Sequence, residues 1–362
     1  MESAEGVACP PGASDANPNL PSNVKPKKAS DKTGAPPSRF SLSMTAGWWR
    51  RLQRVGMYVH WMAPPRPPNP DRTETVKSTL AKKGGKFTVQ IYLPKSYHAS
   101  KKSGRTYPVV VNFHGGGFTL GDATDDARFA RFVLEICDAV FISVDYRLAP
   151  EYPFPTPVDD GTDAILWVIR QAKELRINPL KIATSGFSAG GNLAITVLIR
   201  LATLPSSISV PEHRIVAMTP WYPLTDYTLS RDERRKVAVR VDQTLSPTLT
   251  NLFDASYLYP ADLDLAEPSL SPAKASDELL ERSMPKHVIF YTCEWDMLLQ
   301  EGERFASRLE KDPINKKVHY QMIPGVPHAW DKMPSPMQAP ERSEEFYRQC
   351  CELLKEAFAD EA

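Results

Sequence analysis

The chain is poor in cysteine and has no long hydrophobic run. Its 362 residues include five cysteines, and no pair has the CxxC or Cys/His spacing of a metal site or a disulfide framework. We therefore expect no metal centre and a reducing, cytoplasmic location. No run of about eighteen apolar residues is present, so we expect no transmembrane segment. Residues 1–20 are polar and lack the apolar core of a secretory signal.

Charge of neither sign is in excess. The 44 Lys and Arg residues balance 43 Asp and Glu residues, for a formal net charge of +1. This balance gives no electrostatic reason to expect a nucleic-acid partner. Large apolar side chains are scarce in residues 1–40, which are rich in Pro, Ser, Lys, Gly and Asn. Such a segment buries too little surface to offset its ordering entropy, so we expect a disordered polar tail over residues 1–40.

An amphipathic stretch follows the tail. Its apolar residues recur at steps of four and three, which places them on one face of a helix: Trp48, Leu52, Val55, Val59 and Met62. Pro64 and Pro65 end this helix. We assign residues 41–85 to an N-terminal cap helix region. Three roles stay open for its helix: packing on the main domain, a lid over an apolar pocket, or contact with a membrane surface.

From residue 86 onward, apolar runs typical of buried strands alternate with helical patterns. The predicted strands are 87–93, 109–113, 140–144, 181–184, 215–218, 287–291 and 318–323, and the predicted helices are 125–136, 158–175, 193–204 and 343–357. This alternation predicts an α/β domain over residues 86–362, with a mostly parallel, doubly wound sheet and helices on both faces. The alternation stops between about 221 and 280, and an insertion of that length is usually functional. We interpret it as a second piece of lid.

Two glycine-rich motifs each directly follow a predicted strand. They are His114-Gly115-Gly116-Gly117 and Gly186-Phe187-Ser188-Ala189-Gly190. In the second motif, Gly186 and Gly190 allow the sharp turn that presents the hydroxyl of Ser188 as a nucleophile. Glycines also expose backbone N–H groups, so the N–H groups of Gly115, Gly116 and Ala189 are the candidates for an oxyanion hole. We expect His114 and Gly117 to shape the loop that carries them.

A serine nucleophile needs a base, and the base needs a carboxylate to orient it. In doubly wound folds with this chemistry, the acid and then the histidine follow the serine along the chain. Asp296 lies beyond the predicted strand 287–291, at the edge of the sheet where such groups gather. Glu294 and Glu301 are competing acids. His328 lies between the last predicted strand and the closing helix, and it is the candidate base.

Together these motifs resemble the hormone-sensitive-lipase-type carboxylesterases of the α/β-hydrolase fold. The resemblance covers roughly residues 85–340 and rests on His114 to Phe118, on the string Asp145-Tyr146-Arg147-Leu148-Ala149-Pro150-Glu151, on the Ser188 motif, on Asp296 and on His328. It implies an α/β-hydrolase fold with a lid made of an N-terminal helix and an insertion after the sixth strand. It also implies that residues 145–151 support the site without reacting. Phe187 and Met297 depart from the family, which often has Asp or Thr at the first position and Pro at the second.

We therefore interpret the chain as a serine hydrolase that cleaves carboxylic esters through an acyl-enzyme on Ser188, with no cofactor. The same site would suit an arylformamidase, a lactonase or an acyltransferase, since these share the oxyanion requirement, and a non-catalytic small-molecule receptor is a further alternative. The expected partner is a small-molecule ester. Four aromatic residues either line its pocket or belong to the core: Trp48, Trp61, Trp221 and Tyr222.

Overall fold

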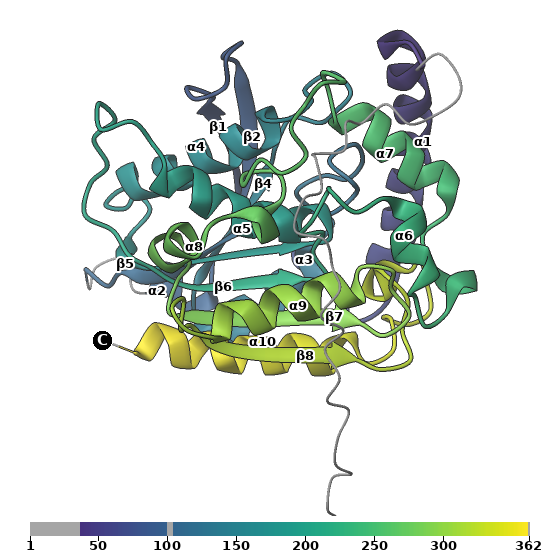
Figure 1. Cartoon of the computed structure of the whole chain (residues 1–362). Helices are drawn as coiled ribbons and strands as arrows, with labels where there is room; N and C mark the ends of the chain where they lie inside the picture. The colour runs from purple at the N-terminus through teal and green to yellow at the C-terminus, as the bar shows by residue number, and fades with distance from the viewer. Residues whose placement is uncertain (1–36, 100–103, 361–362) are drawn as a thin grey trace, which may run out of the picture.

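Eight strands form one sheet within residues 37–99 and 104–360, which are the residues that this computed structural model describes (Figure 1). The strand order is β1-β2-β4-β3-β5-β6-β7-β8. The strands are β1 (Arg72–Lys77), β2 (Lys86–Tyr92), β3 (Tyr107–Phe113), β4 (Val140–Asp145), β5 (Ile177–Phe187), β6 (Ile215–Trp221), β7 (His287–Cys293) and β8 (Lys317–Ile323). The β1–β2 and β2–β4 pairs are antiparallel, and from β4 to β8 every pair is parallel. This is the mostly parallel sheet that the sequence predicts.

Helices cover both faces of the sheet (Figure 1). The helices are α1 (Arg39–Met62), α2 (Lys95–Ala99), α3 (Ala127–Phe132), α4 (Thr156–Arg170), α5 (Ala189–Ala202), α6 (Arg231–Lys236), α7 (Pro247–Tyr257), α8 (Asp277–Ser283), α9 (Leu299–Glu310) and α10 (Ser343–Ala359). Shorter turns are a π-helical turn η1 (Val133–Cys137) and the 3-10 turns η2 (Val241–Gln243), η3 (Pro272–Lys274) and η4 (Trp330–Lys332).

Alternate residues of each central strand enter two separate cores. Val109 and Val111 of β3 belong to the core under α4, α5 and α9, whereas Val110 belongs to the core under α3 and α10. This separation follows from the two-residue period of a strand, and it explains why the central strands are apolar along their whole length.

The predicted strands and helices have counterparts in the structure, with different ends. The predicted helix 125–136 is divided into α3 and the π-helical turn η1, and β5 begins four residues before the expected 181. Strand β1 has no counterpart among the predicted strands. Four of its six residues are exposed and the strand lies at the edge of the sheet, so it lacks the apolar signature of the central strands.

Helix α1 begins at Arg39, inside the range assigned to the polar tail, and the rest of that predicted disordered segment up to residue 36 lies outside the described residues. The predicted apolar face of this helix does not pack on the domain. Trp48, Leu52 and Val55 are exposed, and the buried residues of α1 are Leu42, Ala46 and His60. Among the described residues, no helix is long and apolar enough to cross a bilayer.

The segment between β6 and β7 is helical, which explains the interrupted alternation. It carries α6, η2, α7, η3 and α8, and α7 packs against α1 beyond the carboxyl ends of the parallel strands (Figure 1). Two of the aromatic pocket candidates, Trp221 and Tyr222, belong to the core. Trp221 is buried and stacks on Tyr291, with ring centroids 4.1 Å apart.

Candidate active site

The turn between β5 and α5 holds Ser188 in a strained backbone conformation. Ser188 has φ 57° and ψ −116°, and its amide donates to the carbonyl of Trp221 at 2.9 Å. A Cβ on Gly186 would lie 2.1 Å from the carbonyl oxygen of Gly190, and a Cβ on Gly190 would lie 1.9 Å from that of Phe113. Only glycine fits these two positions, because neither backbone oxygen can move away. The turn therefore presents the Ser188 hydroxyl at the carboxyl edge of the sheet.

Ser188, His328 and Asp296 form one line of hydrogen bonds. The His328 Nε2 atom is 2.8 Å from Ser188 Oγ, and His328 Nδ1 is 2.5 Å from Asp296 Oδ2. The amide of Leu298 donates to the other carboxylate oxygen of Asp296 at 3.0 Å. Since a carboxylate only accepts, Nδ1 carries the proton and Nε2 is left as an acceptor for the Ser188 hydroxyl. Asp296 and His328 are buried, and Ser188 is partly exposed.

The two competing acids have other partners. Glu294 accepts from the amide of Gly325 at 2.6 Å. Glu301 accepts from the amide of Thr225 at 2.8 Å and forms an ion pair with the buried Arg234. Glu294 therefore ties the loop of His328 to the loop of Asp296, and Glu301 ties α9 to the segment after β6.

The glycine loop after β3 passes directly beside the serine turn. A Cβ on Gly115 would lie 3.0 Å from the carbonyl oxygen of Phe187, and Gly116 has φ +106°. Among the described residues, no partner is recorded for the amides of Gly115 and Gly116. Ala189 begins α5, so its amide is among those that have no acceptor within the helix. Three backbone donors are thus free near Ser188.

His114 contacts this loop through its ring and its backbone. Its ring is buried and stacks on Tyr146 with centroids 4.3 Å apart, and its Nδ1 donates to the carbonyl of Gly115 at 2.8 Å. The Tyr146 hydroxyl donates to the carbonyl of His114 at 2.8 Å. A Cβ on Gly117 would lie 2.3 Å from the ring of Phe253 in α7, so the insertion packs on the glycine loop.

Tyr222, which the sequence indicates only as a pocket or core aromatic, supports the ring of His328. The ring of Tyr222 meets that of His328 edge-on, with centroids 4.9 Å apart. The Tyr222 hydroxyl donates to Asp331 Oδ1 at 2.5 Å, and the Tyr347 hydroxyl donates to Asp331 Oδ2. Burial, and then the carboxylate of Asp331, raise the pKa of Tyr222 well above its usual value, so this hydroxyl stays a donor. No sequence motif links these residues, which come from the end of β6, η4 and α10.

A partly buried cation, Lys332, lies beside Phe187, one of the two residues that differ from the family pattern. Lys332 Nζ is 2.7 Å from Asp126, 3.3 Å from Asp331, and 3.9 Å from the centroid of the Phe187 ring. Burial opposes its charge, but the two carboxylates outweigh burial and raise the pKa of Lys332. An aromatic face next to a charged ammonium is favourable. Phe187 therefore packs within this charged cluster without disturbing the serine turn.

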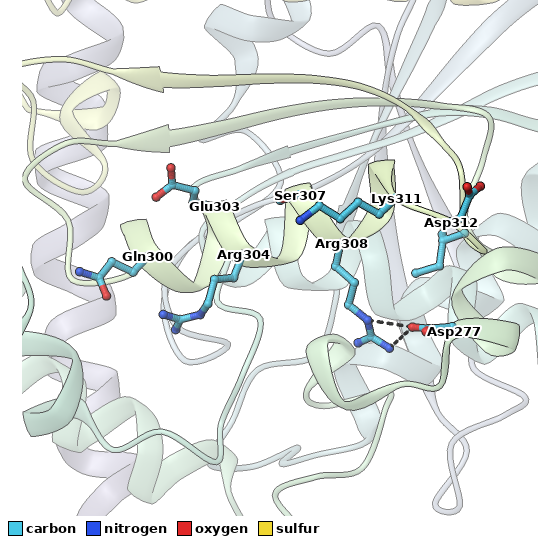
Figure 2. Close-up of a pocket in the computed structure, with 9 residues that line it drawn as sticks. Asp277, Gln300, Glu303, Arg304, Ser307, Arg308, Lys311 and Asp312 are labelled. Carbon is cyan, nitrogen blue, oxygen red and sulfur yellow. Dashed lines mark hydrogen bonds and ion pairs between the residues drawn. The ribbon is translucent and has the colours of Figure 1, made fainter. Parts of the chain in front are cut away.

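A hollow lies on the outer surface of α9, away from these residues (Figure 2). It has a volume of about 620 Å³, and charged side chains such as Glu303, Arg304 and Lys311 project around it. Arg308 there pairs with Asp277 at 2.5 Å. None of the candidate site residues lines this hollow. Within the described part of the chain, no group of three or more His, Cys, Asp or Glu side chains is arranged to hold a metal ion.

Comparison with known sequences agrees with the geometry. A family model described as the alpha/beta hydrolase fold matches residues 110–332. The chain is 36% identical over 208 residues to an arylesterase of Saccharolobus solfataricus, covering 57% of this chain and 63% of that one. It is 33% identical over 216 residues to the carboxylic ester hydrolase LipN of Mycobacterium tuberculosis, covering 59% and 54%. The matches thus span less than two thirds of the length of these relatives.

Solved structures of esterases are similar to this chain over a longer part of its length. The Pyrobaculum calidifontis esterase superposes with a TM-score of 0.70 at 28% identity, covering 86% of this chain and 92% of that one. The carboxylesterase EstE1, cloned from a metagenomic library, superposes with a TM-score of 0.70 at 26% identity, covering 86% and 97%. Since the family model spans the sheet from β3 to the loop of His328, the chain belongs to the hormone-sensitive-lipase-type carboxylesterase family of the α/β-hydrolase fold.

Proposed function

We propose that this protein hydrolyses carboxylic esters of small molecules through an acyl-enzyme on Ser188. One observation carries the proposal: a strained serine on a strand-to-helix turn is hydrogen-bonded to His328, which is hydrogen-bonded to the buried Asp296. A serine hydroxyl is a weak nucleophile by itself, and this arrangement gives its proton an acceptor. The esterase names of the relatives point to the same chemistry.

In the first half of the reaction, Ser188 Oγ attacks the ester carbonyl carbon while its proton passes to His328 Nε2. The carbonyl oxygen becomes an oxyanion, which accepts hydrogen bonds from the amides of Gly115, Gly116 and Ala189. Each such donor contributes about 3 kcal/mol to the stability of the transition state. His328 then gives the proton to the departing alcohol oxygen, which leaves the acyl group on Ser188.

In the second half, His328 takes a proton from water, and the hydroxide formed attacks the acyl carbon. The tetrahedral intermediate collapses, the proton returns to Ser188 Oγ, and the carboxylic acid leaves. Asp296 holds the imidazole in one tautomer and stabilises the imidazolium that forms in each half. The ion pair of Asp296 and His328 is buried, so these interactions are weakly screened by solvent.

We further propose that α1 and the segment 221–280 form a cap over this site. Three contacts support the cap. Phe253 of α7 lies against Gly117, the Arg39 guanidinium donates to the carbonyls of Ala255 and Ser256 at 3.2 and 3.1 Å, and Arg50 donates to the carbonyl of Thr119 at 2.8 Å. A cytoplasmic setting is also proposed, because it would keep the four buried free thiols of the described residues reduced.

The test compares two serines of the same turn region. Ser188→Ala is expected to lower kcat on p-nitrophenyl acetate and butyrate by about 10⁴-fold or more, and to abolish labelling by a fluorophosphonate probe. Ser185→Ala is the matched control, because the Ser185 hydroxyl is buried and has no hydrogen-bond partner within the described residues. It is expected to retain activity and labelling. Residual activity of Ser188→Ala within tenfold of the parent protein would remove Ser188 from the mechanism.

A substrate panel decides which bond is cleaved. The parent protein is assayed on p-nitrophenyl esters of graded acyl length, on formyl amides, on lactones, and with added alcohol as an acyl acceptor. The ester-hydrolase proposal expects the highest kcat/KM on esters, with water as acceptor. A hundredfold preference for a formyl amide or a lactone, or dominant transfer to alcohol, would replace it. Absence of probe labelling altogether would favour a non-catalytic receptor.

A further inference from the structure

Helix α1 presents an apolar stripe to solvent along its whole length. The seven large residues of this stripe are between 37 and 77% exposed: Phe40, Met44, Trp48, Leu52, Val55, Tyr58 and Met62. They follow one another at steps of three or four residues, so they lie on one face of the helix. Over 24 residues this face is about 36 Å long. We call these seven residues the α1 apolar face.

The opposite side of α1 is held to the protein, so the helix cannot simply turn its apolar face inward. Arg50 donates to the carbonyls of Thr119 and Ala149 at 2.8 and 2.7 Å. The small buried side chain of Ala46 allows close packing, and the buried His60 is bonded to Arg128. The helix is therefore oriented by polar and small residues, and the seven large side chains of its apolar face are left at least 37% exposed.

The exposed apolar residues are unevenly distributed over the protein. Sixteen large apolar residues of the described structure are exposed, and seven of them form the α1 apolar face. Isolated exposed apolar residues are normal in soluble domains, but a continuous face of this size marks an interaction site. The remaining exposed apolar residues include Met333, whose carbonyl lies 3.3 Å from the Nδ1 atom of His60 at the end of α1.

The charged residues of α1 itself and of the segment just after it have one sign, although Asp122 and Asp125 share a hollow with Arg54 and Tyr58. Residues 32–70 contain no Asp or Glu, although the whole chain has 43 acidic residues. Arg51, Arg54 and Arg66 are exposed on α1 and just beyond its end. A helix with a continuous apolar face and flanking arginines is the kind that lies in the interface of an anionic bilayer, with long cationic side chains reaching the headgroups.

Two other occupants fit less well. A second copy of the chain would bring Arg51 and Arg54 of two identical faces together, and like charges repel. Residues 1–36 contain no aromatic residue, and Val7, Leu20 and Val24 are their only branched aliphatic ones, so this segment offers little apolar surface to cover seven large side chains. We propose that the α1 apolar face binds the surface of an anionic lipid bilayer, so that the cap side of the protein faces the membrane.

The experiment measures flotation of the full chain with vesicles of phosphatidylcholine alone or of phosphatidylcholine mixed with phosphatidylserine. The parent protein is expected to bind the mixed vesicles and to dissociate as salt is raised, because exposed charges are then screened. The triple variant Trp48→Ser, Val55→Ser and Tyr58→Ser is expected to lower the partition coefficient by at least about tenfold. The double variant Arg51→Glu and Arg54→Glu is expected to lower it by a similar factor.

Two controls make the result specific. Leu180→Ser changes an exposed apolar residue on β5, ahead of the stretch that leads into Ser188, and it is expected to bind like the parent protein. Ser188→Ala should also bind unchanged, so failure of the ester-hydrolase proposal would leave this one standing. A parent protein that floats with neither kind of vesicle would overturn the membrane proposal. So would a triple variant that binds as well as the parent, or a dimer of the parent that the triple variant dissociates while vesicle binding is absent.

Discussion

At the scale of single residues, the position of His328 depends on a neighbour that takes no part in proton transfer. The ring of Tyr222 lies edge-on to the imidazole, and its hydroxyl is fixed by Asp331. Asp331 is itself buried and held by Tyr347. Because the Tyr222 ring contacts the imidazole and its hydroxyl is anchored, the imidazole has little freedom to rotate away from Ser188. Small displacements of a catalytic base lower the reaction rate strongly.

We therefore expect Tyr222→Phe to lower kcat by about tenfold while KM changes little, because the ring stays but its anchor is lost. Tyr320→Phe is the matched control. The Tyr320 hydroxyl also has one side-chain partner, Thr292 at 2.8 Å, but it lies between β7 and β8, away from His328. Steady-state kinetics on a p-nitrophenyl ester checks both variants. A kcat of Tyr222→Phe within twofold of the parent protein would show that this anchor does not position His328.

The site residues differ in how much the sequence could reveal of them. Ser188 and the glycine loop were predictable, since both chemistry and backbone geometry restrict the residue types there. His328 and Asp296 were predictable from chain order together with their placement just after the last two predicted strands, although chain order did not exclude Glu294 and Glu301. Tyr222 and Asp331 were not, because their roles exist only after β6 and the loop following β8 are brought together, and neither residue lies in a motif that requires it.

At the scale of elements, the carboxyl end of α1 is capped from outside the helix. The buried guanidinium of Arg128, in α3, donates to the carbonyls of His60 at 2.6 Å, Ala63 at 2.7 Å and Pro65 at 2.9 Å. The last carbonyls of a helix have no partner within it, and a cation there is also favoured by the helix dipole. One side chain thus satisfies the end of α1 and fixes it on the domain.

Removing the Arg128 side chain from the end of α1 is expected to lower the stability of the protein. Arg128→Met keeps most of the aliphatic stem but leaves buried carbonyls without donors, so the free energy of unfolding should fall by about 3 kcal/mol. Arg131→Met is the matched control one turn along α3, since the pair of Arg131 with Glu344 is partly exposed and its loss should change stability by less than about 1 kcal/mol. Urea unfolding at constant pH measures both. Equal, small losses for the two variants would contradict the capping role.

For α1, the periodicity of the sequence predicts the helix but not the surroundings of its apolar face. The spacing of Trp48, Leu52 and Val55 predicts a helix with one apolar face, and α1 is that helix. Periodicity does not say what the apolar face contacts, because a protein core and a bilayer produce the same pattern. The orientation of α1 is decided by polar contacts of Arg50 and Arg128. Most of their partners are backbone carbonyls, which carry no sequence signal.

At the scale of the whole molecule, α1 connects segments that are far apart in the sequence. Arg39 reaches the end of α7, Arg50 reaches the loop that follows β3, and His60 reaches the loop after β8 through the carbonyl of Met333. These are the segments that carry Phe253, the free glycine amides and His328. We therefore expect a shift in the position of α1 to move the glycine loop, the insertion and the loop of His328 together.

The buried His60 makes this connection depend on pH. Burial, and then the charges of Lys332 and Arg128, lower the pKa of His60 from 6.5 to about 4. The unfolded chain then takes up a proton more readily than the folded one, so the stability from this group is present above about pH 6.5 and is lost as the pH falls toward 4. Between pH 7 and pH 5 the expected loss is about 2 kcal/mol.

We therefore expect His60→Gln to flatten this dependence, because glutamine does not titrate and its amide can both accept from Arg128 and donate to Met333. Urea unfolding of the parent protein and the variant at pH 7 and pH 5 gives two differences, and the parent should lose about 2 kcal/mol more than His60→Gln. Groups common to both proteins, such as Asp125, whose pKa is raised by burial of its carboxyl group, cancel in this comparison. His98→Gln is the control, because that histidine is exposed and its substitution should leave the parent's pH dependence intact. Parallel losses in the parent and His60→Gln would mean that His60 takes up its proton equally readily in the folded and the unfolded chain, so the lowered pKa of His60 would have to be abandoned.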